Sequence, residues 1–527
     1  MAARIMSTKR PVRFFNTTGP CNPDDHYMLP PEERLVGAQL HRYISDKLYW
    51  VLHAPRQTGK TTFLQSWMRE INAGEEAVAC YVSVEACQGV TDTQEAARII
   101  SRSIRVVAEN AGLPNPIPEQ SAPDTLYADT LVQLSKIVAP KPLIILFDEV
   151  DVLEGEPLIR FLRLLREGFA GRGVGAFPIS IALVGMRDLK DYITASKGGV
   201  APNPGSPFNV KEDSAVLSNF HKADIANLFA QRTAETGQQI TPDALDYVWE
   251  QSKGQPWIVN SLFKRATMRV LDEKSTDTVT PEHIRQARQQ MIEARETHLD
   301  ALAYRMEDPK IRNVMDSLIT GEPNPQLAEG DAFRICLDLG LVVIEDGTPQ
   351  VANPIYREII ARQLTYSTQL AIVKPSWQWQ LPDGSLDMDR LLKEFQKFWQ
   401  RHSEIWEQKA DYTEAFPHLL LMAFLQRVTN GGGQIEREYA AGRGRLDLAV
   451  EYNKRWYIIE IKIIHYYDTP EMVQEEGLEQ IRGYRDKIDA AAPAYLVIFD
   501  RRPETKSKPW IERLRWTQAD DVTIVEC

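Results

Sequence analysis

Short apolar runs alternate with helical patterns from about residue 49 to residue 220, and this alternation restricts the fold more than any other feature. Apolar runs of this length, separated by amphipathic helices, are typical of a parallel sheet covered by helices. We therefore predict an α/β domain here. The strand candidates are residues 49–53, 77–84, 143–147 and 179–184, with helices such as 61–71 and 93–111 between them.

A phosphate-binding loop is predicted directly after the first strand. The segment Ala54-Pro-Arg-Gln-Thr-Gly-Lys-Thr61 fits G-x-x-x-x-G-K-[ST], with Ala54 in place of the first glycine. Such a loop wraps backbone N–H groups around phosphate oxygens at the positive end of a helix, and Gly59 lets the backbone approach closely. We expect Lys60 to reach the β and γ phosphates and Thr61 to ligate Mg²⁺. The alternative is an ordinary glycine turn between strand and helix.

Two carboxylates follow the third predicted strand, in Asp148-Glu149. Ligands collect at the carboxyl edge of a parallel sheet, so we assign Asp148 to the metal and Glu149 to the catalytic base. Arg187 ends the next strand at the same edge and is predicted to sense the γ-phosphate, although pairing with a local aspartate would also explain it. The predicted nucleotide contacts are Arg56, Gln57, Thr58, Gly59, Lys60, Thr61, Thr62, Asp148, Arg187 and Pro256.

On these motifs, residues 14–360 resemble an AAA-like ATPase of the STAND type. Gly254-Gln-Pro-Trp257 is similar to the G-x-P that opens a lid helix near bound nucleotide in that class. The resemblance implies an ATP-binding domain, a helical lid, a winged helix, and nucleotide used as a conformational switch. It also suggests that residues 16–31 contact the adenine.

A second set of polar residues lies near the C-terminus. Along the predicted strand 456–463 the side chains alternate, so Glu460 and Lys462 share one face. A hairpin partner is expected to bring Asp447 alongside. Two carboxylates and the backbone carbonyl of Ile461 could hold a divalent cation, and the lysine could stabilise charge on phosphate. Any half-exposed strand with an ion pair across its face would show the same residues.

The combination of Asp447, the E-x-K strand and a glutamine on the following helix resembles the PD-(D/E)XK nuclease superfamily. That resemblance implies a restriction-endonuclease-like α/β fold in which Asp447, Glu460 and Lys462 are catalytic, with Gln480 and Tyr484 on the facing helix. Leu446 stands where the family has proline. An upstream carboxylate of the family maps to Glu414 or Glu438, and the sequence does not choose between them. The implied cation is Mg²⁺, with Mn²⁺ as an alternative.

Chain length and these patterns together predict five segments. A chain of 527 residues is too long for one hydrophobic core. The segments are an ATPase domain at residues 1–220, a helical lid at 221–298, a winged helix at 299–365, a linker at 366–389 and a nuclease-like domain at 390–527.

Charge and hydropathy restrict the partners. The formal net charge of −12 excludes a general coating role on nucleic acid, so any contact needs a local basic face. Two candidates are the group Arg443, Arg445, Arg482 and Arg485, and the segment 501–516, although a solvated helix face would explain the latter equally well. The acidic segment 328–340 disfavours DNA reading by the winged helix. No apolar run approaches membrane-spanning length, and the chain lacks a secretory signal pattern, which predicts a cytoplasmic protein.

The leading hypothesis is an ATP-regulated, metal-dependent nuclease, by analogy one that acts in defence against foreign nucleic acid, with DNA favoured over RNA. The alternative is a nucleotide-switched scaffold whose nuclease-like module grips nucleic acid without cutting it. Endo or exo action, the trigger, the oligomeric state and the turnover of ATP are left open by the sequence.

Overall fold

The computed structural model describes most of the chain and divides it into two compact units. The first unit comprises Met1–His298 and Arg334–Ile355, and the second comprises Leu299–Phe333 and Tyr356–Cys527. The described residues are 12–36, 39–172, 176–186, 211–272, 275–294, 302, 304–320, 330–364, 379–407, 421, 424–425, 433–437, 440–441, 444–445, 448–464, 468–500, 502–506 and 508–527.

The first unit is built on a six-stranded sheet with the order β1-β6-β2-β5-β4-β3. All neighbouring strands run parallel except the short pair β1–β6. One strand, β5, therefore separates β2, which precedes the phosphate-binding loop, from β4, which carries Asp148. The strands are β1 (Leu35–Val36), β2 (Tyr49–His53), β3 (Val78–Ser83), β4 (Leu143–Asp148), β5 (Ser180–Gly185) and β6 (Lys211–Leu217).

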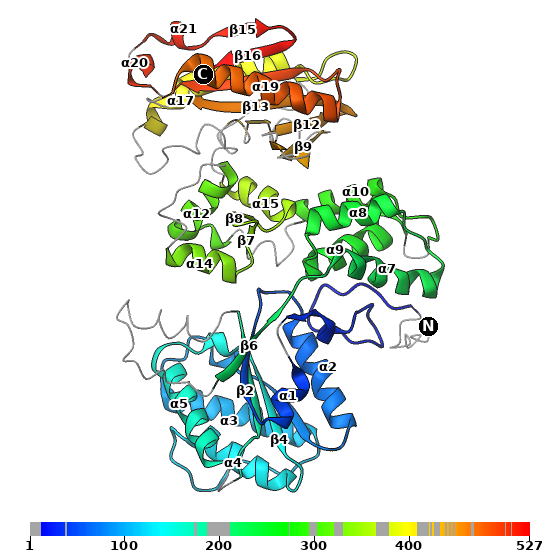
Figure 1. Ribbon diagram of the computed structural model, residues 1–527, viewed down its shortest axis with the longest axis vertical. Coiled ribbons are helices and arrows are strands. Elements are labelled where there is room, and N and C mark those ends of the chain that lie inside the picture. Colours follow the sequence, from blue (N-terminus) through cyan, green and yellow to red (C-terminus); the bar gives the residue numbers. More distant parts are fainter. Residues whose placement is uncertain are drawn as a thin grey trace, which may run out of the picture. The chain divides into compact units, whose positions relative to one another are not determined.

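Helices cover both faces of this sheet because alternate residues of each strand are apolar on opposite sides (Figure 1). On β2, Trp50 and Leu52 pack with α1 and α2, whereas Tyr49 and Val51 pack with α3, α4 and α5. The helices are α1 (Leu40–Ser45), α2 (Lys60–Ala73), α3 (Thr93–Asn110), α4 (Leu126–Val138) and α5 (Gly155–Gly171).

The predicted strands and the predicted α/β class of this region are confirmed, with ends that differ by one or two residues. The sequence analysis did not identify β1 and β6. β1 has only two residues, and β6 contains the polar run Lys-Glu-Asp-Ser, so neither shows the apolar pattern of a buried strand.

A helical region follows the sheet. Its helices are α7 (Lys222–Thr236), α8 (Pro242–Ser252), α9 (Pro256–Arg265) and α10 (Pro281–Glu293), with a π-helical turn at Ala266–Val270 after α9. Among the residues with assigned positions, no helix has the length and apolar character needed to cross a lipid bilayer.

The elements of the predicted winged helix are present, while their assembly into one remains a prediction. A two-stranded hairpin turns at Asp346-Gly347, where both residues have positive φ. The elements are α12 (Pro309–Thr320), α14 (Asp331–Asp338), β7 (Val342–Glu345), β8 (Thr348–Val351) and α15 (Pro354–Leu364).

The second unit has a mixed six-stranded sheet with the order β15-β16-β14-β13-β12-β9. Its centre is parallel, because β13 pairs with β14 and β14 pairs with β16 in that sense. The strands are β9 (Gly433–Arg437), β12 (Leu448–Tyr452), β13 (Arg455–Ile464), β14 (Ala494–Asp500), β15 (Trp516–Ala519) and β16 (Val522–Glu526), besides the separate two-residue pair β10 (Ala440–Ala441) and β11 (Gly444–Arg445).

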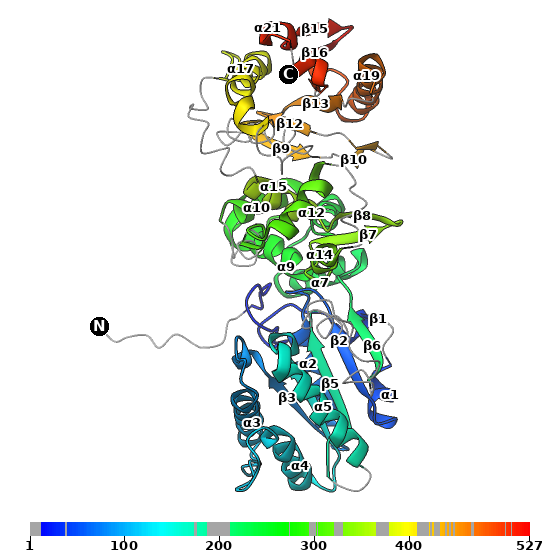
Figure 2. The same ribbon diagram turned by 90° about the vertical axis from the view of Figure 1, so that its left-hand side faces the viewer.

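One long helix covers each face of this second sheet, as Figure 2 shows. On one face, α17 (Met388–Glu407) places Phe395 and Trp399 against Phe499 of β14. On the other, α19 (Pro470–Ile488) packs on β13 and β14. Two further one-turn helices are α20 (Pro503–Lys506) and α21 (Trp510–Arg513).

Part of the predicted linker packs on this unit. Its residues 366–378 lie outside the described residues, but a turn at 379–387 contacts the β12–β13 hairpin. There Asp383 pairs with Arg455 at 2.8 Å, and the backbone N–H of Leu386 donates to the hydroxyl of Tyr457.

Two glycines with positive φ allow the cost of a steric clash to be separated from the cost of backbone strain. Gly254 has φ +76°, and a Cβ there would overlap the carbonyl oxygen of Phe220. Gly237 has φ +78° with open space around it. Gly237→Ala should therefore cost only the left-handed strain of about 1–2 kcal/mol, whereas Gly254→Ala should cost about 1–3 kcal/mol more. Urea unfolding of both variants measures the difference, and equal losses would contradict the packing argument.

Candidate functional sites

The phosphate-binding loop connects β2 to α2 in a conformation that depends on Gly59. Gly59 caps α2 with φ +94°, a left-handed conformation that glycine adopts without strain. Gln57 also has positive φ, at 64°. Ala54, by contrast, is buried and its backbone φ is not positive, so the position does not need the glycine of the usual motif.

Lys60 lies over this loop. Its ammonium Nζ donates to the carbonyl oxygens of Ala54 at 2.8 Å and Pro55 at 2.9 Å. Desolvation by the surrounding protein lowers the pKa of Lys60 to about 8, although the nearby carboxylate of Asp148 opposes this shift. A cation held this way can exchange carbonyl partners for phosphate oxygens of opposite charge.

Asp148 brings the loop helix and the neighbouring strands together. The carboxylate, which is 1% exposed, accepts hydrogen bonds from the hydroxyls of Thr61 at 2.7 Å and Tyr81 at 3.0 Å. Its other oxygen accepts from the backbone N–H of Glu149. The hydroxyl of Thr61 and the carboxylate of Asp148 are hard oxygen donors side by side, so they fit a Mg²⁺ ion.

Glu149 has the environment of a proton acceptor. Its backbone is left-handed, with φ 60°, which is a strained conformation for a residue other than glycine. Burial raises the pKa of Glu149 to about 7, with a further contribution from the negative charge of Glu85. The hydroxyl of Ser83 lies 3.4 Å from its carboxylate. A carboxyl with this pKa can take up a proton near neutral pH.

These residues line a cavity of about 710 Å³, a volume that suits a nucleotide. Of the predicted nucleotide contacts, the structure places the following in its lining: Arg56, Gln57, Gly59, Lys60, Thr61, Thr62, Asp148 and Pro256. Glu149 also lines it. Thr58 is buried beneath the loop and donates to the carbonyl of Pro55. Arg187 lies outside the described residues.

The N-terminal loop and the lid helix α9 line the cavity on its other side. Asn16, Thr17 and Cys21, from the segment predicted to contact the adenine, belong to the lining. The carbonyl of Thr17 accepts from the indole N–H of Trp257 on α9 at 2.9 Å, and the backbone N–H of Cys21 donates to Thr62 at 3.0 Å.

Arg34, Tyr81 and Asp151 are among the residues of this cavity that were not predicted from the sequence. Tyr81 lies within a predicted strand and Asp151 follows another, so their positions in the sequence could have placed them near the site. Burial raises the pKa of Asp151. Arg34 lies on a one-turn 3₁₀ helix (Pro31–Arg34) remote from the motif, and no sequence pattern identified it.

The second predicted site lies on β13 of the other unit. The predicted hairpin partner of this strand is present, with Leu448 of β12 opposite Ile459 of β13. Glu460 is 3% exposed, and its carboxylate lies 3.6 Å from the ammonium of Lys462, so the two side chains share the face under α19 as predicted. The side chain of Ile461 points to the opposite face of β13 from Glu460 and Lys462.

The helix α19 contributes one residue that the sequence analysis did not select. Glu476 pairs with the ammonium of Lys462 at 3.0 Å and accepts from the amide of Gln480 at 3.3 Å. It lies one turn before Gln480 on the same face, so helical spacing was the signal that could have found it. Gly477 allows the helix to approach, because a Cβ there would lie 2.6 Å from Leu496.

The metal set predicted for this site is only partly described. Asp447, Glu414 and Glu438 lie outside the described residues. Within the part of the chain that the structure covers, no three histidine, cysteine, aspartate or glutamate side chains converge as a metal site. Glu460 and the carbonyl of Ile461 are oxygen donors of the kind that Mg²⁺ or Mn²⁺ accepts.

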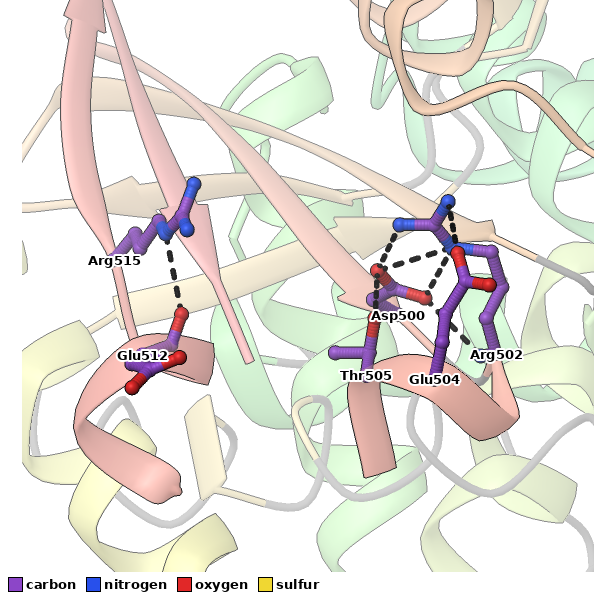
Figure 3. A network of polar contacts seen from close by, with 6 residues as sticks. All are labelled: Asp500, Arg502, Glu504, Thr505, Glu512 and Arg515. Atoms are coloured by element: carbon purple, nitrogen blue, oxygen red, sulfur yellow. Dashed lines mark hydrogen bonds and ion pairs between the residues drawn. The ribbon is translucent and has the colours of Figure 1, made fainter. Parts of the chain in front are cut away.

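Several of the basic residues proposed to meet a phosphate backbone have acidic partners. Arg482 pairs with Asp520 at 2.6 Å, and Arg485 pairs with Asp521. In the C-terminal segment, Arg502 donates two hydrogen bonds to the carboxylate of Asp500 and forms an ion pair with Glu504 (Figure 3). These arginines are therefore partly neutralised, which weakens the predicted basic face.

A family model supports the resemblance of the C-terminal part. A model described as the PD-(D/E)XK nuclease superfamily matches residues 412–498, a range that includes Glu460, Lys462 and Gln480. The chain thus combines a parallel-sheet, P-loop ATPase-like region with a C-terminal PD-(D/E)XK domain, as the sequence analysis predicted. No curated protein matches the chain.

The solved structures similar to this chain are remote from it in sequence. A Walker-type ATPase of Pyrococcus abyssi is 13% identical with a TM-score of 0.46, over 66% of this chain and 99% of that one. Cdc6p of Pyrobaculum aerophilum is 15% identical with a TM-score of 0.33, over 63% and 96%. The RuvB Holliday junction branch migration motor of Thermotoga maritima is 13% identical with a TM-score of 0.33, over 60% and 90%.

The network around Asp500 predicts a pH-dependent loss of stability. Burial of this carboxylate favours its neutral form, but hydrogen bonds from Arg502 and Thr505 outweigh that effect and lower its pKa. The stabilisation is present above the unfolded pKa of about 3.9 and is lost as the pH falls through the lower folded value. Asp500→Asn should cost about 2 kcal/mol at pH 7 and less at about pH 3.

Urea unfolding at both pH values tests this. Asp520→Asn is the matched control, because its ion pair with Arg482 is exposed and should contribute less than about 1 kcal/mol. A loss for Asp500→Asn that does not change with pH would contradict the electrostatic explanation.

Proposed function

We propose that this protein is an ATP-regulated, metal-dependent nuclease. ATP binds in the cavity of the first unit, and the second unit cleaves phosphodiester bonds of nucleic acid at Glu460 and Lys462, with Asp447 completing the set. The observation that carries the nucleotide half is the hydrogen bond between Thr61 and Asp148 at the wall of a nucleotide-sized cavity.

The residues of the cavity support distinct tasks around a triphosphate. Backbone N–H groups of the loop and the ammonium of Lys60 bind phosphate oxygens. Thr61 and Asp148 would hold Mg²⁺, whose charge offsets that of the phosphates when it is bound. Glu149 accepts the proton of the attacking water, a role that fits a pKa of about 7.

The nuclease half is supported by the family match and by the shared face of Glu460 and Lys462. Glu460 is positioned by a buried strand, so its carboxylate has a defined location for a divalent ion. Lys462 places a positive charge on the same face, where it can stabilise charge that develops on a phosphate. DNA is the proposed substrate.

We also propose that nucleotide binding in the first unit regulates cleavage by the second, because one chain contains both. A nucleotide site whose wall includes the lid helix α9 can change with the ligand, because Trp257 on that helix contacts the N-terminal loop through Thr17. We propose that this change permits or restrains cleavage, in defence against foreign nucleic acid. A trigger protein and a homo-oligomer are compatible with such a switch.

One observation favours a second candidate, a nucleotide-switched scaffold that grips nucleic acid without cutting it. The ammonium of Lys462 is engaged by Glu476, which lies closer to it than Glu460 does. A lysine that stays in this pair is not available to a phosphate.

Substitutions in the cavity should separate nucleotide binding from hydrolysis. Lys60→Ala should weaken ATP binding by at least about 10-fold, because it removes a charged hydrogen-bond donor to phosphate. Glu149→Gln should keep the affinity but lower hydrolysis by about 100-fold or more. Isothermal titration and phosphate release measure the two effects, with Lys141→Ala, an exposed lysine of the same unit, as control. Unchanged ATP affinity in Lys60→Ala would refute the nucleotide site.

Substitution of Lys462 tests cleavage. Wild type should cut plasmid, single-stranded DNA or RNA in the presence of Mg²⁺ or Mn²⁺, and Lys462→Ala should lower that rate by about 100-fold or more. Assays with and without ATP show whether nucleotide regulates the reaction. Lys397→Ala removes an exposed lysine of the same unit and should leave the rate unchanged. If wild type and Lys462→Ala are equally inert on every substrate while ATP still binds, the scaffold function replaces the nuclease.

A further inference from the structure

Arg34 is a buried cation in the wall of the nucleotide cavity. Arg34 is 7% exposed, yet it belongs to the cavity lining together with Gly59 and Lys60. Among the residues whose positions are described, no carboxylate forms an ion pair with it. Buried charges in proteins are normally paired, so an arginine in this state needs an explanation.

Neutral groups hold the guanidinium in one orientation. Its Nε donates to the carbonyl of Ser218 at 3.0 Å, and one terminal nitrogen donates to the carbonyl of Thr58 in the phosphate-binding loop. The carbon Cζ lies 4.8 Å from the centre of the Phe220 ring, a cation–π contact. These partners fix the plane of the group, and the negative charge of Asp224 acts on it only from beyond ion-pair distance.

The other terminal nitrogen, Nη1, lies beside the loop glycine. A Cβ placed on Gly59 would be 3.6 Å from it, so this nitrogen approaches the turn whose backbone N–H groups face phosphate. Arg34 keeps its charge at neutral pH, although desolvation lowers its pKa to about 10. The free donors therefore point to where an anion is expected.

We propose that Arg34 is a nucleotide-binding residue that contacts the phosphate chain through Nη1, as a second buried cation beside Lys60. This inference rests on the proposed nucleotide site. The contact with the carbonyl of Thr58 gives Arg34 a second role, since it holds the loop while the loop binds phosphate. The guanidinium geometry suits both roles, because its forked donors can serve two carbonyls and an anion at once.

Nucleotides of different charge provide the test. In displacement titrations, Arg34→Met should weaken ATP by about 10- to 100-fold, ADP by less, and adenosine hardly at all. Arg42→Met, an exposed arginine on α1 that pairs with Asp46, should leave all three affinities unchanged. Equal losses for ATP and adenosine, or no loss for ATP, would overturn the proposal.

A second variant covers the case in which Arg34→Met does not fold. Arg34→Lys keeps the charge but cannot reach both carbonyls and the phosphate, so the same order of losses is expected at smaller size. Losses that are equal across the three ligands, or absent, would overturn the proposal here too. If wild type itself fails to bind ATP, the proposed nucleotide function fails, which is a different outcome from an Arg34 variant that binds as well as wild type.

Discussion

The parallel arrangement of β2, β5 and β4 is the constraint on which the first unit depends, because it brings Thr61 and Asp148, 87 residues apart, within a hydrogen bond of 2.7 Å. The two residues meet because both β2 and β4 are parallel strands whose carboxyl ends lie at one sheet edge. The strand β5 between them sets their separation. Burial of the apolar faces of these strands under helices on both sides keeps that edge rigid, so the polar groups are held in place by packing that does not involve them.

The cavity at this edge divides its charges between two walls. The carboxylates of Asp148, Glu149 and Asp151 come from the end of β4, while Lys60 and Arg34 lie at the phosphate-binding loop. Burial disfavours the charged forms of Lys60 and Glu149, which explains why the pKa values of these two residues move toward neutrality from opposite directions. A ligand with several negative charges would compensate the charges of Lys60 and Arg34, and an accompanying cation would compensate those of the carboxylates.

The charged side chains of the second unit are arranged differently from those of the cavity. Several of its described arginines pair with neighbouring acids, as Arg502 does with Asp500. On the face beneath α19, one lysine, Lys462, lies near two carboxylates, those of Glu460 and Glu476. A phosphate backbone that approached this face would have to compete with Glu476 for the lysine.

The sequence by itself determined the local features of this protein. Apolar periodicity identified the central strands, the spacing of Gly59, Lys60 and Thr61 identified the loop, and alternation along β13 placed Glu460 and Lys462 on one face. The strands β1 and β6 and the cavity wall at Arg34 were decided only by the tertiary structure. The physical reason is that periodicity records which side of its own element a residue faces, whereas these groups acquire their roles from elements distant in the chain, through contacts that leave no local pattern.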